Sequence, residues 1–324
     1  MKYLASLAML GLTLAAATPA AAQSSSLVLY NAGGLKLMQA IVDDFTKKNP
    51  AIKVEVINGG VGELITRIRA EAARARGDVY FAASSDAYDF ALDNFESYKS
   101  TEDAAFDRKT VQKDNKYYGF SQPLQAFVIN TKMMPLDKAP KSWADLAKPE
   151  YKGKVLMAQP AQSGSAYSQM YQIVGLHGWD AMAKVIQNGT FVTSSKLAYA
   201  NVGTGEFPIG ITGEFNVLTM KDEGQPVAAI YPSEGTGLTM DGNGIIKGAP
   251  NLANAKKFID YANSKAAHEI LVKIDNRRSV RPDVPAPAGL PSTTEIKVVP
   301  YDSVAAAGKK KEYLERFDKI FSAK

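Results

Sequence analysis

Cysteine is absent from the chain, and histidine and tryptophan occur only twice each among its 324 residues. The lack of cysteine excludes disulfides, thiolate metal sites and a thiol nucleophile. The two histidines, His177 and His268, lie near the ends of expected helices and have neither metal-ligand spacing nor a recognisable nucleophile beside them. These shortages disfavour the commonest hydrolytic and metal-dependent chemistries.

A large excess of charge of one sign is also lacking. The formal net charge is +5, and the charged residues are spread along the chain. Such a mild positive field can steer an anionic solute but gives no indication of nucleic-acid binding. The one basic run, Lys309-Lys310-Lys311, is interpreted as the solvated start of a helix.

The only long apolar run lies at the N-terminus. Residues 1–22 combine Lys2, an apolar run over residues 4–17 and the small residues Ala20-Ala21-Ala22 before Gln23. This pattern predicts a cleavable secretory signal and therefore a periplasmic protein, with an uncleaved anchor as the alternative. The mature chain of about 300 residues is long enough for two domains of roughly 150 residues.

The first third of the mature chain alternates strands and helices. Apolar strand patterns at residues 27–30, 52–56 and 78–81 are each followed by a turn rich in glycine or serine and then, after the first two, by a helical pattern. The glycines of two of these turns, Gly33 with Gly34 and Gly60 with Gly62, would let a ligand approach the helix starts closely, unless they serve the turns alone. The alternation predicts an α/β domain with a doubly wound parallel sheet.

The middle of the chain predicts a second domain. Extended patterns at residues 117–131 and 239–246 flank a second strand-helix alternation that begins at residue 155. We therefore expect two lobes joined by two extended hinge segments. Lobe I comprises residues 23–125 and 238–300, lobe II comprises residues 126–237, and residues 301–324 form a C-terminal helix that packs on the lobes. Lobes joined in this way commonly close around a ligand.

The turn Gln162-Ser163-Gly164-Ser165-Ala166-Tyr167 is the leading candidate for a ligand site. It lies between the apolar strand at residues 155–158 and a helical pattern. A serine-glycine turn that opens a helix offers free backbone N–H groups and the positive end of the helix dipole, which favour an oxyanion. Because serine is also a common capping residue, an ordinary helix cap is the alternative.

The order of several short motifs resembles a known family, the periplasmic solute-binding proteins of ABC importers, in the branch of the ferric-iron binders. The motifs are Leu29-Tyr30-Asn31, Gly62-Glu63-Leu64-Ile65 with Arg69-Ala70-Glu71, Asp78-Val79, Phe127-Val128-Ile129-Asn130-Thr131, Ser163-Gly164-Ser165-Ala166-Tyr167, Gly205-Glu206-Phe207-Pro208 and Arg278-Ser279-Val280-Arg281-Pro282. The resemblance implies a type II periplasmic binding fold, a monomer that delivers its ligand to an ABC permease and its ATPase, no enzymatic activity and no cofactor.

The chain departs from the iron-binding pattern at three places. Where iron binders carry a histidine, an acidic residue and a tyrosine pair, this sequence has Gly33-Gly34, Ala82-Ala83 and Phe215-Asn216. Ferric iron prefers phenolate and carboxylate oxygens, so iron binding with a companion anion is an alternative that would need Tyr88, Tyr167 and Tyr199. The anion-binding turn is retained, which resembles relatives that bind hexose phosphates or 2-aminoalkylphosphonates.

Glu214 bears on the organic part of the ligand. A carboxylate beside a phosphoryl group would repel it, unless the ligand also carries hydroxyl or ammonium groups that bind the carboxylate. An exposed glutamate at a helix start is the alternative. Asp86 also has two possible roles, a contact to the ligand or a helix cap. Arg278 and Arg281 could reach the ligand as anion partners, but we expect them to tie the C-terminal segment to the lobes.

The sequence thus predicts that the protein captures a small phosphate-bearing organic solute. We expect no residue of the site to bind a metal ion. An exported phosphate-ester hydrolase is the alternative from another class, since two-lobed α/β folds also host enzymes. Ser195 is a further hydroxyl beside the predicted site. The predicted ligand-binding residues are Gly33, Gly34, Ser84, Ser85, Ser163, Gly164, Ser165, Ser194, Glu214, Phe215 and Asn216.

Overall fold

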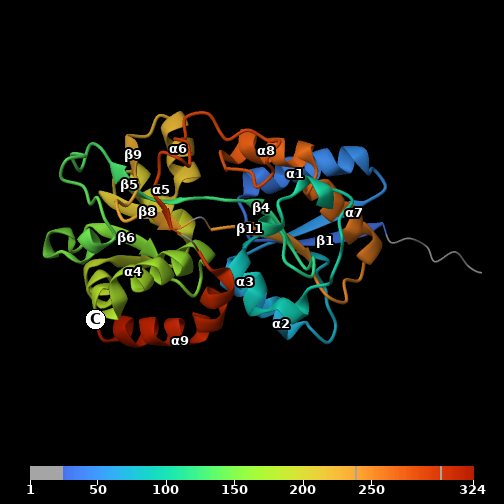
Figure 1. Ribbon diagram of the computed structural model, residues 1–324, viewed down its shortest axis with the longest axis horizontal. Coiled ribbons are helices and arrows are strands. Elements are labelled where there is room, and N and C mark those ends of the chain that lie inside the picture. The colour runs from blue at the N-terminus through green and yellow to red at the C-terminus, as the bar shows by residue number, and fades with distance from the viewer. Residues whose placement is uncertain (1–24, 238, 300) are drawn as a thin grey trace, which may run out of the picture.

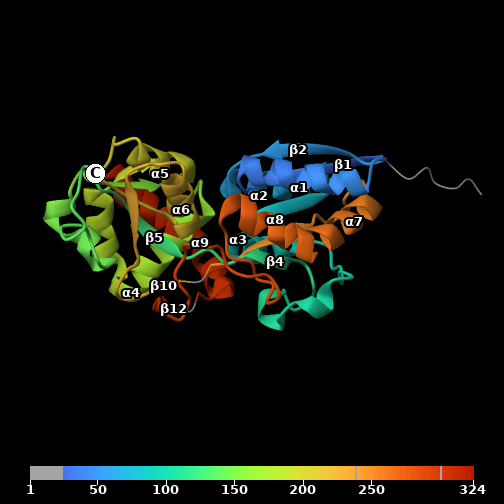
Figure 2. The same ribbon diagram turned by 90° about the horizontal axis from the view of Figure 1, so that it is seen from above.

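The computed structural model describes residues 25–237, 239–299 and 301–324. The predicted signal segment, residues 1–22, lies outside these ranges. Figure 1 shows two lobes side by side along the long axis, and Figure 2 shows the same arrangement from above. Each lobe is built on one five-stranded sheet.

Lobe I contains the sheet with strand order β2-β1-β3-β11-β4. Its strands are β1 (Ser26–Asn31), β2 (Lys53–Asn58), β3 (Val79–Ser84), β4 (Tyr118–Ser121) and β11 (Asp241–Ile245). Its helices are α1 (Leu35–Lys48), α2 (Val61–Ala70), α3 (Ser85–Phe90), α7 (Leu252–Ala262) and α8 (Lys265–Asp275), with short 3-10 helices at Leu92–Asn94, Asp103–Ala105 and Arg108–Thr110. Helix α1 buries Leu37, Ile41 and Phe45 at helical spacing, and Phe45 contacts Phe258 of α7 edge-on in the core.

Lobe II contains the sheet with strand order β7-β6-β8-β5-β9. Its strands are β5 (Gln125–Asn130), β6 (Val155–Ala158), β7 (Thr190–Val192), β8 (Ile209–Gly213) and β9 (Val227–Ile230). Its helices are α4 (Gly164–Asn188), α5 (Ser195–Gly203) and α6 (Glu214–Asp222), with 3-10 helices at Ala144–Ala147 and Pro149–Tyr151. The core is centred on Trp143, whose ring meets Phe127 at 5.1 Å.

The chain passes between the lobes at residues 122–124, from β4 to β5, again between β10 (Thr236–Gly237) and β11, and a third time after α8, before β12 (Val298–Val299). Strand β10 pairs with β12. The prediction of parallel pairing holds for the alternating strands β1, β2 and β3 and for β6, β7 and β8, whereas β11 runs antiparallel in the first sheet and β5 antiparallel in the second. Each of these strands has just entered its lobe from the other lobe, and therefore runs against its neighbours.

Helix α9 (Ser303–Ser322) packs against lobe II and also reaches α3 of lobe I (Figure 1). It contributes Tyr313 and Phe317 to the core of lobe II. The prediction that Lys309-Lys310-Lys311 is a solvated helix start was wrong for Lys310, which is buried and forms a 2.6 Å ion pair with Asp86 of α3. In the described ranges, no helix has the length and apolarity that a bilayer-spanning segment needs.

His268 gives the folded state a pH dependence. Its imidazole is buried on α8 against Phe120, and Nδ1 lies 2.7 Å from Ser279 Oγ. Burial, reinforced by the Arg281 charge, lowers the pKa of His268 to about 3. The unfolded chain takes up this proton near pH 6.5 and the folded chain does not, so stability falls as the pH drops below 6.5, by about 1.4 kcal/mol per pH unit.

We expect the loss at pH 5 to be about 2 kcal/mol from this residue alone. Urea unfolding of the wild type and of His268→Asn, measured between pH 7.5 and 4.5, checks the expectation, because the variant should lose this part of the slope. His177→Asn removes the other histidine and should keep it. Equal slopes in the wild type and His268→Asn would contradict the assignment.

Candidate ligand-binding site

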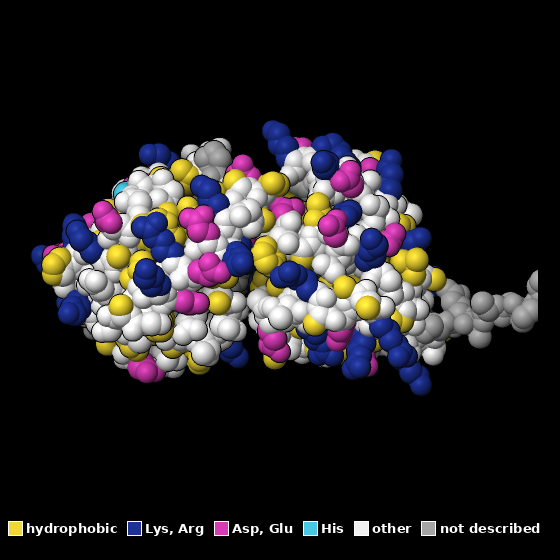
Figure 3. Space-filling model, turned by 90° about the horizontal axis from the view of Figure 1, so that it is seen from below, with side chains coloured by type: hydrophobic (Ala, Val, Ile, Leu, Met, Phe, Trp, Pro, Cys, Tyr) yellow, Lys and Arg dark blue, Asp and Glu magenta, His cyan; other side chains and the backbone are white. Residues whose placement is uncertain are grey.

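The helices that follow the strands begin where the two lobes face each other. Helices α1, α2 and α3 follow β1, β2 and β3 in lobe I, and α4, α5 and α6 follow β6, β7 and β8 in lobe II. Because the carboxyl ends of parallel strands share one edge of a sheet, these helix starts gather at the lobe boundary. The space-filling view shows this boundary as a narrow furrow, with Lys and Arg scattered over both lobes on the face in view (Figure 3). Six helix N-termini favour negative charge there.

Three serine hydroxyls meet at the N-termini of α4 and α5. Ser165 Oγ lies 3.1 Å from Ser163 Oγ and 3.2 Å from Ser195 Oγ, and Ser163 and Ser195 are also within hydrogen-bond distance. Ser163 additionally caps α4 by accepting the Ala166 N–H at 3.2 Å. Two helix starts thus present three hydroxyl donors at one point, which is an arrangement that favours an oxyanion.

Ser84 of lobe I faces this hydroxyl cluster across the boundary. Its Oγ is buried and has no hydrogen-bond partner among the described residues. A Cβ atom added at Gly164, the first residue of α4, would lie 2.5 Å from that Oγ. Burying a hydroxyl without a hydrogen-bond partner costs free energy. The Ser84 hydroxyl is therefore placed to donate a hydrogen bond to a ligand at the start of α4.

The glycines before α2 serve contact between the lobes. A Cβ atom at Gly62 would lie 2.0 Å from the Ala161 carbonyl oxygen, and one at Gly60 would lie 2.7 Å from that of Gln162. Any side chain at these positions would push α2 away from the anion turn. The interpretation that Gly60 and Gly62 admit a ligand was therefore wrong: they admit the backbone of lobe II.

The Gly33-Gly34 turn of lobe I faces a carboxylate of its own chain. Gly33 is held by a 3.0 Å bond from its N–H to Asn31 Oδ1. Gly34 is the N-cap of α1, and a Cβ atom there would lie 3.4 Å from Asp275 Oδ1. Because Asp275 already places negative charge at the start of α1, α4 and α5 offer the better anion site.

Arg277 links the lobes at the other end of the boundary. Its guanidinium lies 3.8 Å from the centre of the Phe215 ring of α6 and binds the carboxylates of Asp275 and Asp241. Burial raises the pKa of both carboxyls, and Arg277 opposes that rise. The sequence prediction included Phe215 but missed Arg277. The polar run Asp275-Asn276-Arg277-Arg278 after an amphipathic helix was the available signal.

Glu214 is occupied by an ion pair across the lobes. Its carboxylate accepts Arg278 Nε at 2.7 Å and Nη2 at 3.1 Å, and the Tyr231 hydroxyl at 2.6 Å. The side chains of Glu214 and Arg278 are 1% and 7% exposed. Neither the ligand role predicted for Glu214 nor its alternative, an exposed helix start, agrees with this geometry, whereas Arg278 does tie segments together as expected.

Four other candidate residues have structural partners. Ser194 Oγ caps α5 by accepting the Leu197 N–H at 3.3 Å, so the adjacent Ser195 carries the cluster hydroxyl instead. Ser85 is buried, and its N–H donates to the Met240 carbonyl at 2.8 Å. Asn216 Nδ2 donates to Thr212 Oγ1 at 2.7 Å. Asp86 pairs with Lys310, whereas Ser84 occupies the N-cap position of α3 that was the alternative for Asp86.

Two of the three tyrosines considered for iron are already bonded. Tyr88 donates to the Tyr80 and Gly242 carbonyls at 2.6 and 3.0 Å, and Tyr167 donates to the Ala306 carbonyl. Tyr199 lies one turn beyond Ser195 on α5. Within the described part of the chain, no group of three or more His, Asp or Glu side chains is arranged to hold a metal ion.

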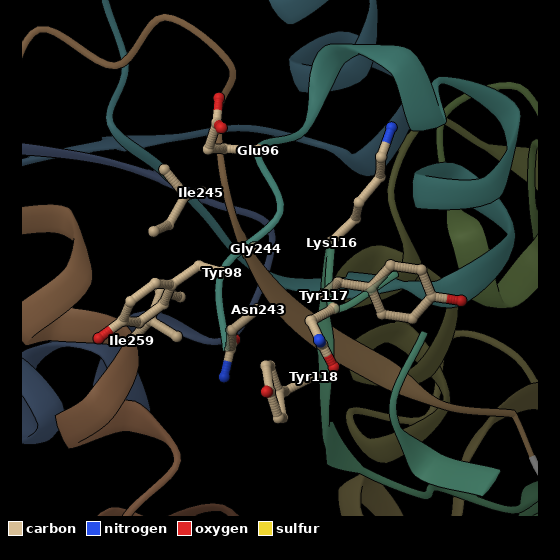
Figure 4. A pocket seen from close by; sticks show the side chains of 10 residues that line it. Glu96, Tyr98, Lys116, Tyr117, Tyr118, Asn243, Gly244, Ile245 and Ile259 are labelled. Atoms are coloured by element: carbon tan, nitrogen blue, oxygen red, sulfur yellow. The ribbon is translucent and has the colours of Figure 1, made fainter. Parts of the chain in front are cut away.

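A hollow on lobe I, drawn in Figure 4, offers no alternative site. It is lined by Tyr98, Tyr118 and Asn243, among others, and has no volume that a water molecule can enter. Its polar groups are used locally: the Tyr98 hydroxyl donates to Asp260 at 2.8 Å. This hollow therefore does not compete with the boundary between the lobes as a candidate site.

Comparison with known proteins finds a matching family model and several similar bacterial proteins. The family model described as bacterial extracellular solute-binding protein matches residues 40–298. An uncharacterised protein of Haemophilus influenzae is 31% identical over 261 residues, which are 76% of this chain and 75% of that protein. The Fe(3+)-binding periplasmic protein of Serratia marcescens is 26% identical over 80% of this chain and 79% of its own length.

Two further proteins bear on the ligand. A periplasmic protein of Salmonella typhimurium, named for 2-aminoethylphosphonate binding, is 26% identical over 87% of this chain and 86% of its own length. The structure of the periplasmic binding protein AfuA from Actinobacillus pleuropneumoniae, with exogenous fructose-6-phosphate bound, superimposes with a TM-score of 0.86. It is 25% identical, and the match covers 92% of this chain and 99% of that one. This similarity confirms the predicted α/β fold with two lobes of the type II class.

Proposed function

Because the chain belongs to the family of bacterial extracellular solute-binding proteins, we propose that it captures a small phosphate- or phosphonate-bearing solute between its lobes. The observation that supports the proposal is the cluster of Ser163, Ser165 and Ser195 hydroxyls at two helix N-termini, opposite the unpaired Ser84. The chain is a binding protein and not an enzyme, as the relatives are named for binding.

The hydroxyl cluster suits a phosphoryl group in number and in charge. Three hydroxyls that now pair with one another can each turn a proton toward an oxygen of the anion. The N-termini of α4 and α5 add favourable dipoles and free N–H groups. Ser84 then donates from lobe I to the same anion, so the bound ligand joins both lobes and favours the closed form.

The acidic end of the boundary selects the organic part of the ligand in this proposal. Arg277 binds the Oδ2 atoms of Asp275 and Asp241, which leaves the Oδ1 atoms to accept hydroxyl or ammonium groups. Tyr199 lies on the same face of α5 as Ser195, since the two are four residues apart. Asp275 and Asp241 thus take the role that the sequence had suggested for Glu214.

Location and partners follow from the family. The relatives are named as periplasmic, and the predicted signal segment is consistent with export to the same compartment. We infer that the loaded protein delivers its solute to an ABC permease with its ATPase. It would act as a monomer, as each chain holds a whole site between its lobes.

A panel of ligands tests the proposal by thermal unfolding. At a hundred times its Kd, a ligand stabilises the folded protein by about 2.7 kcal/mol, which corresponds to a rise in Tm of about 4 °C for a chain of this size. We expect such a rise with fructose 6-phosphate or 2-aminoethylphosphonate.

Fructose and ethanolamine, which lack the phosphoryl group, are matched controls and should leave Tm unchanged. The absence of any shift with phosphoryl compounds would contradict the proposal. Ferric citrate tests the iron alternative, because iron bound through phenolates would produce a visible charge-transfer band. Of the three tyrosines considered, Tyr88 and Tyr167 already donate hydrogen bonds in the described structure, which leaves only Tyr199.

A further inference from the structure

One face of α4 runs from the anion site toward the hinge. Ser165, Gln169 and Gln172 are spaced by four and three residues, so their side chains follow one stripe along the helix. Ser165 belongs to the hydroxyl cluster. Gln169 and Gln172 are buried, at 1% and 6% exposure. Buried glutamines at these positions need hydrogen-bond partners.

The two glutamines bind the two hinge strands. Gln169 Nε2 donates to Gln125 Oε1 at 2.7 Å, and Gln125 is the first residue of β5 after the first passage between the lobes. Gln172 Oε1 accepts the Gly237 N–H at 2.6 Å, and Gly237 ends β10 before the second passage. The Gln125 N–H also donates to Thr236 Oγ1 at 3.2 Å. The stripe therefore holds the first and second passages and joins them to each other.

The contact with β10 is close, and the two glutamines each keep one amide atom without a partner in the described part of the chain. A Cβ atom at Gly237 would lie 2.8 Å from the Gln172 amide, so glycine is required for this approach. Gln169 Oε1 and Gln172 Nε2 are buried without partners among the described residues. Each glutamine thus keeps one amide atom that is able to take a partner in another hinge position.

We propose that Gln169 and Gln172 are positioning residues that couple the anion site on α4 to the hinge. The inference rests on the proposed function for the nature of the ligand, but the contacts to Gln125 and Gly237 do not depend on it. An anion that draws Ser165 into place fixes the start of α4, and the glutamines transmit that position to the lobe II ends of the first and second passages. Closure and ligand binding are then linked through one helix.

Asparagine variants test the coupling, because they keep the amide and shorten its reach by one methylene group. We expect Gln172→Asn and Gln169→Asn each to raise the Kd for fructose 6-phosphate and 2-aminoethylphosphonate about tenfold. Gly237→Ala should have the same effect from the other side, since its methyl group displaces the Gln172 amide. Gln187→Asn makes the same change at an exposed position of α4 and should bind like the wild type.

Native tryptophan fluorescence reports the hinge. The Trp143 indole donates to the Gly235 carbonyl at 3.0 Å, immediately before β10. In a Trp179→Phe background, Trp143 is the sole tryptophan. We expect ligand to change its emission in the parent protein and to change it by less than half as much in the three hinge variants. Hydrogen exchange of the Gly237 amide, measured without ligand, should become faster in Gln172→Asn.

Each outcome supports or overturns the coupling. Wild-type affinity and an undiminished Trp143 response in the hinge variants would overturn it, as would a lower Tm with unchanged Kd, which indicates packing alone. If the wild type binds neither compound, the proposed function fails, and the exchange rate of Gly237 still decides the hinge contact. Unchanged exchange in Gln172→Asn would then overturn the inference.

Discussion

Replacing Glu214 by glutamine is expected to lower the free energy of unfolding by about 3–5 kcal/mol, because it leaves the buried Arg278 guanidinium without its counter-charge. Both oxygens of Glu214 accept hydrogen bonds from Arg278, and the pair is almost fully removed from solvent. Glutamine keeps the shape of the side chain, so the loss reports the charge. Urea unfolding at pH 7.5 measures it.

The position of this pair explains why the effect extends beyond stability. Gln122, in the first passage between the lobes, donates its N–H to the Arg278 carbonyl at 2.9 Å, and Glu214 donates its own N–H to the Leu124 carbonyl at 2.9 Å. The ion pair therefore joins lobe I to lobe II directly beside the hinge. Its loss should loosen the pivot as well as the fold.

A double replacement separates the lost partner from the lost packing. In Glu214→Leu combined with Arg278→Met, no buried charge remains, and we expect a smaller loss of stability than in Glu214→Gln. The Tyr231 hydroxyl and the Pro291 carbonyl, which also bind this pair, keep the double variant below the wild type. If Glu214→Gln instead keeps its stability and loses ligand affinity, Glu214 contacts the ligand and the hinge assignment is wrong.

The fold was predictable because its signals are local. The strand patterns at β1 and β2 end in glycine turns and are followed by helical patterns, and the apolar spacing of Met38, Ile41 and Phe45 needs no knowledge of distant residues. The extended segments that became β5 and β11 were predicted, but their antiparallel direction was missed for the opposite reason. Their direction depends on where the chain came from, namely the other lobe, and no local pattern carries that information.

The site was only partly predictable for the same reason. The Ser163-Gly164-Ser165 turn has a sequence signature, since a strand, a serine turn and a helix follow one another. The ion pairs of Glu214 and Asp86 have no such signature, because their partners are distant in the sequence. Arg278 lies 64 residues from Glu214, and Lys310 lies 224 residues from Asp86. A polar residue at a helix start can bind a ligand, cap the helix or join an ion pair, and only the tertiary contacts decide among these roles.

Removing two hydroxyls from the anion site should greatly weaken ligand binding and lower the free energy of unfolding only slightly. Each hydrogen bond to a charged group contributes about 1.5–3 kcal/mol, so Ser163→Ala with Ser165→Ala is expected to raise the Kd of a phosphoryl ligand at least about a hundredfold. Loss of the Ser163 cap adds about 1 kcal/mol of destabilisation. Isothermal titration with fructose 6-phosphate or 2-aminoethylphosphonate measures the first effect, and urea unfolding measures the second.

Ser194→Ala is the matched control for this double variant. Ser194 caps α5 as Ser163 caps α4, but Leu197 N–H engages its hydroxyl away from the cluster. The control should therefore lose a similar cap energy of about 1 kcal/mol and retain wild-type affinity, whereas Ser195→Ala, one residue further on, should weaken binding about tenfold or more. Equal affinity in the double variant and the wild type would reduce the serine turn to a helix cap. Weakened binding in Ser194→Ala would show instead that loss of a helix cap alone disturbs the site. A larger loss of affinity in Ser195→Ala than in Ser194→Ala is what assigns the effect to the hydroxyl cluster.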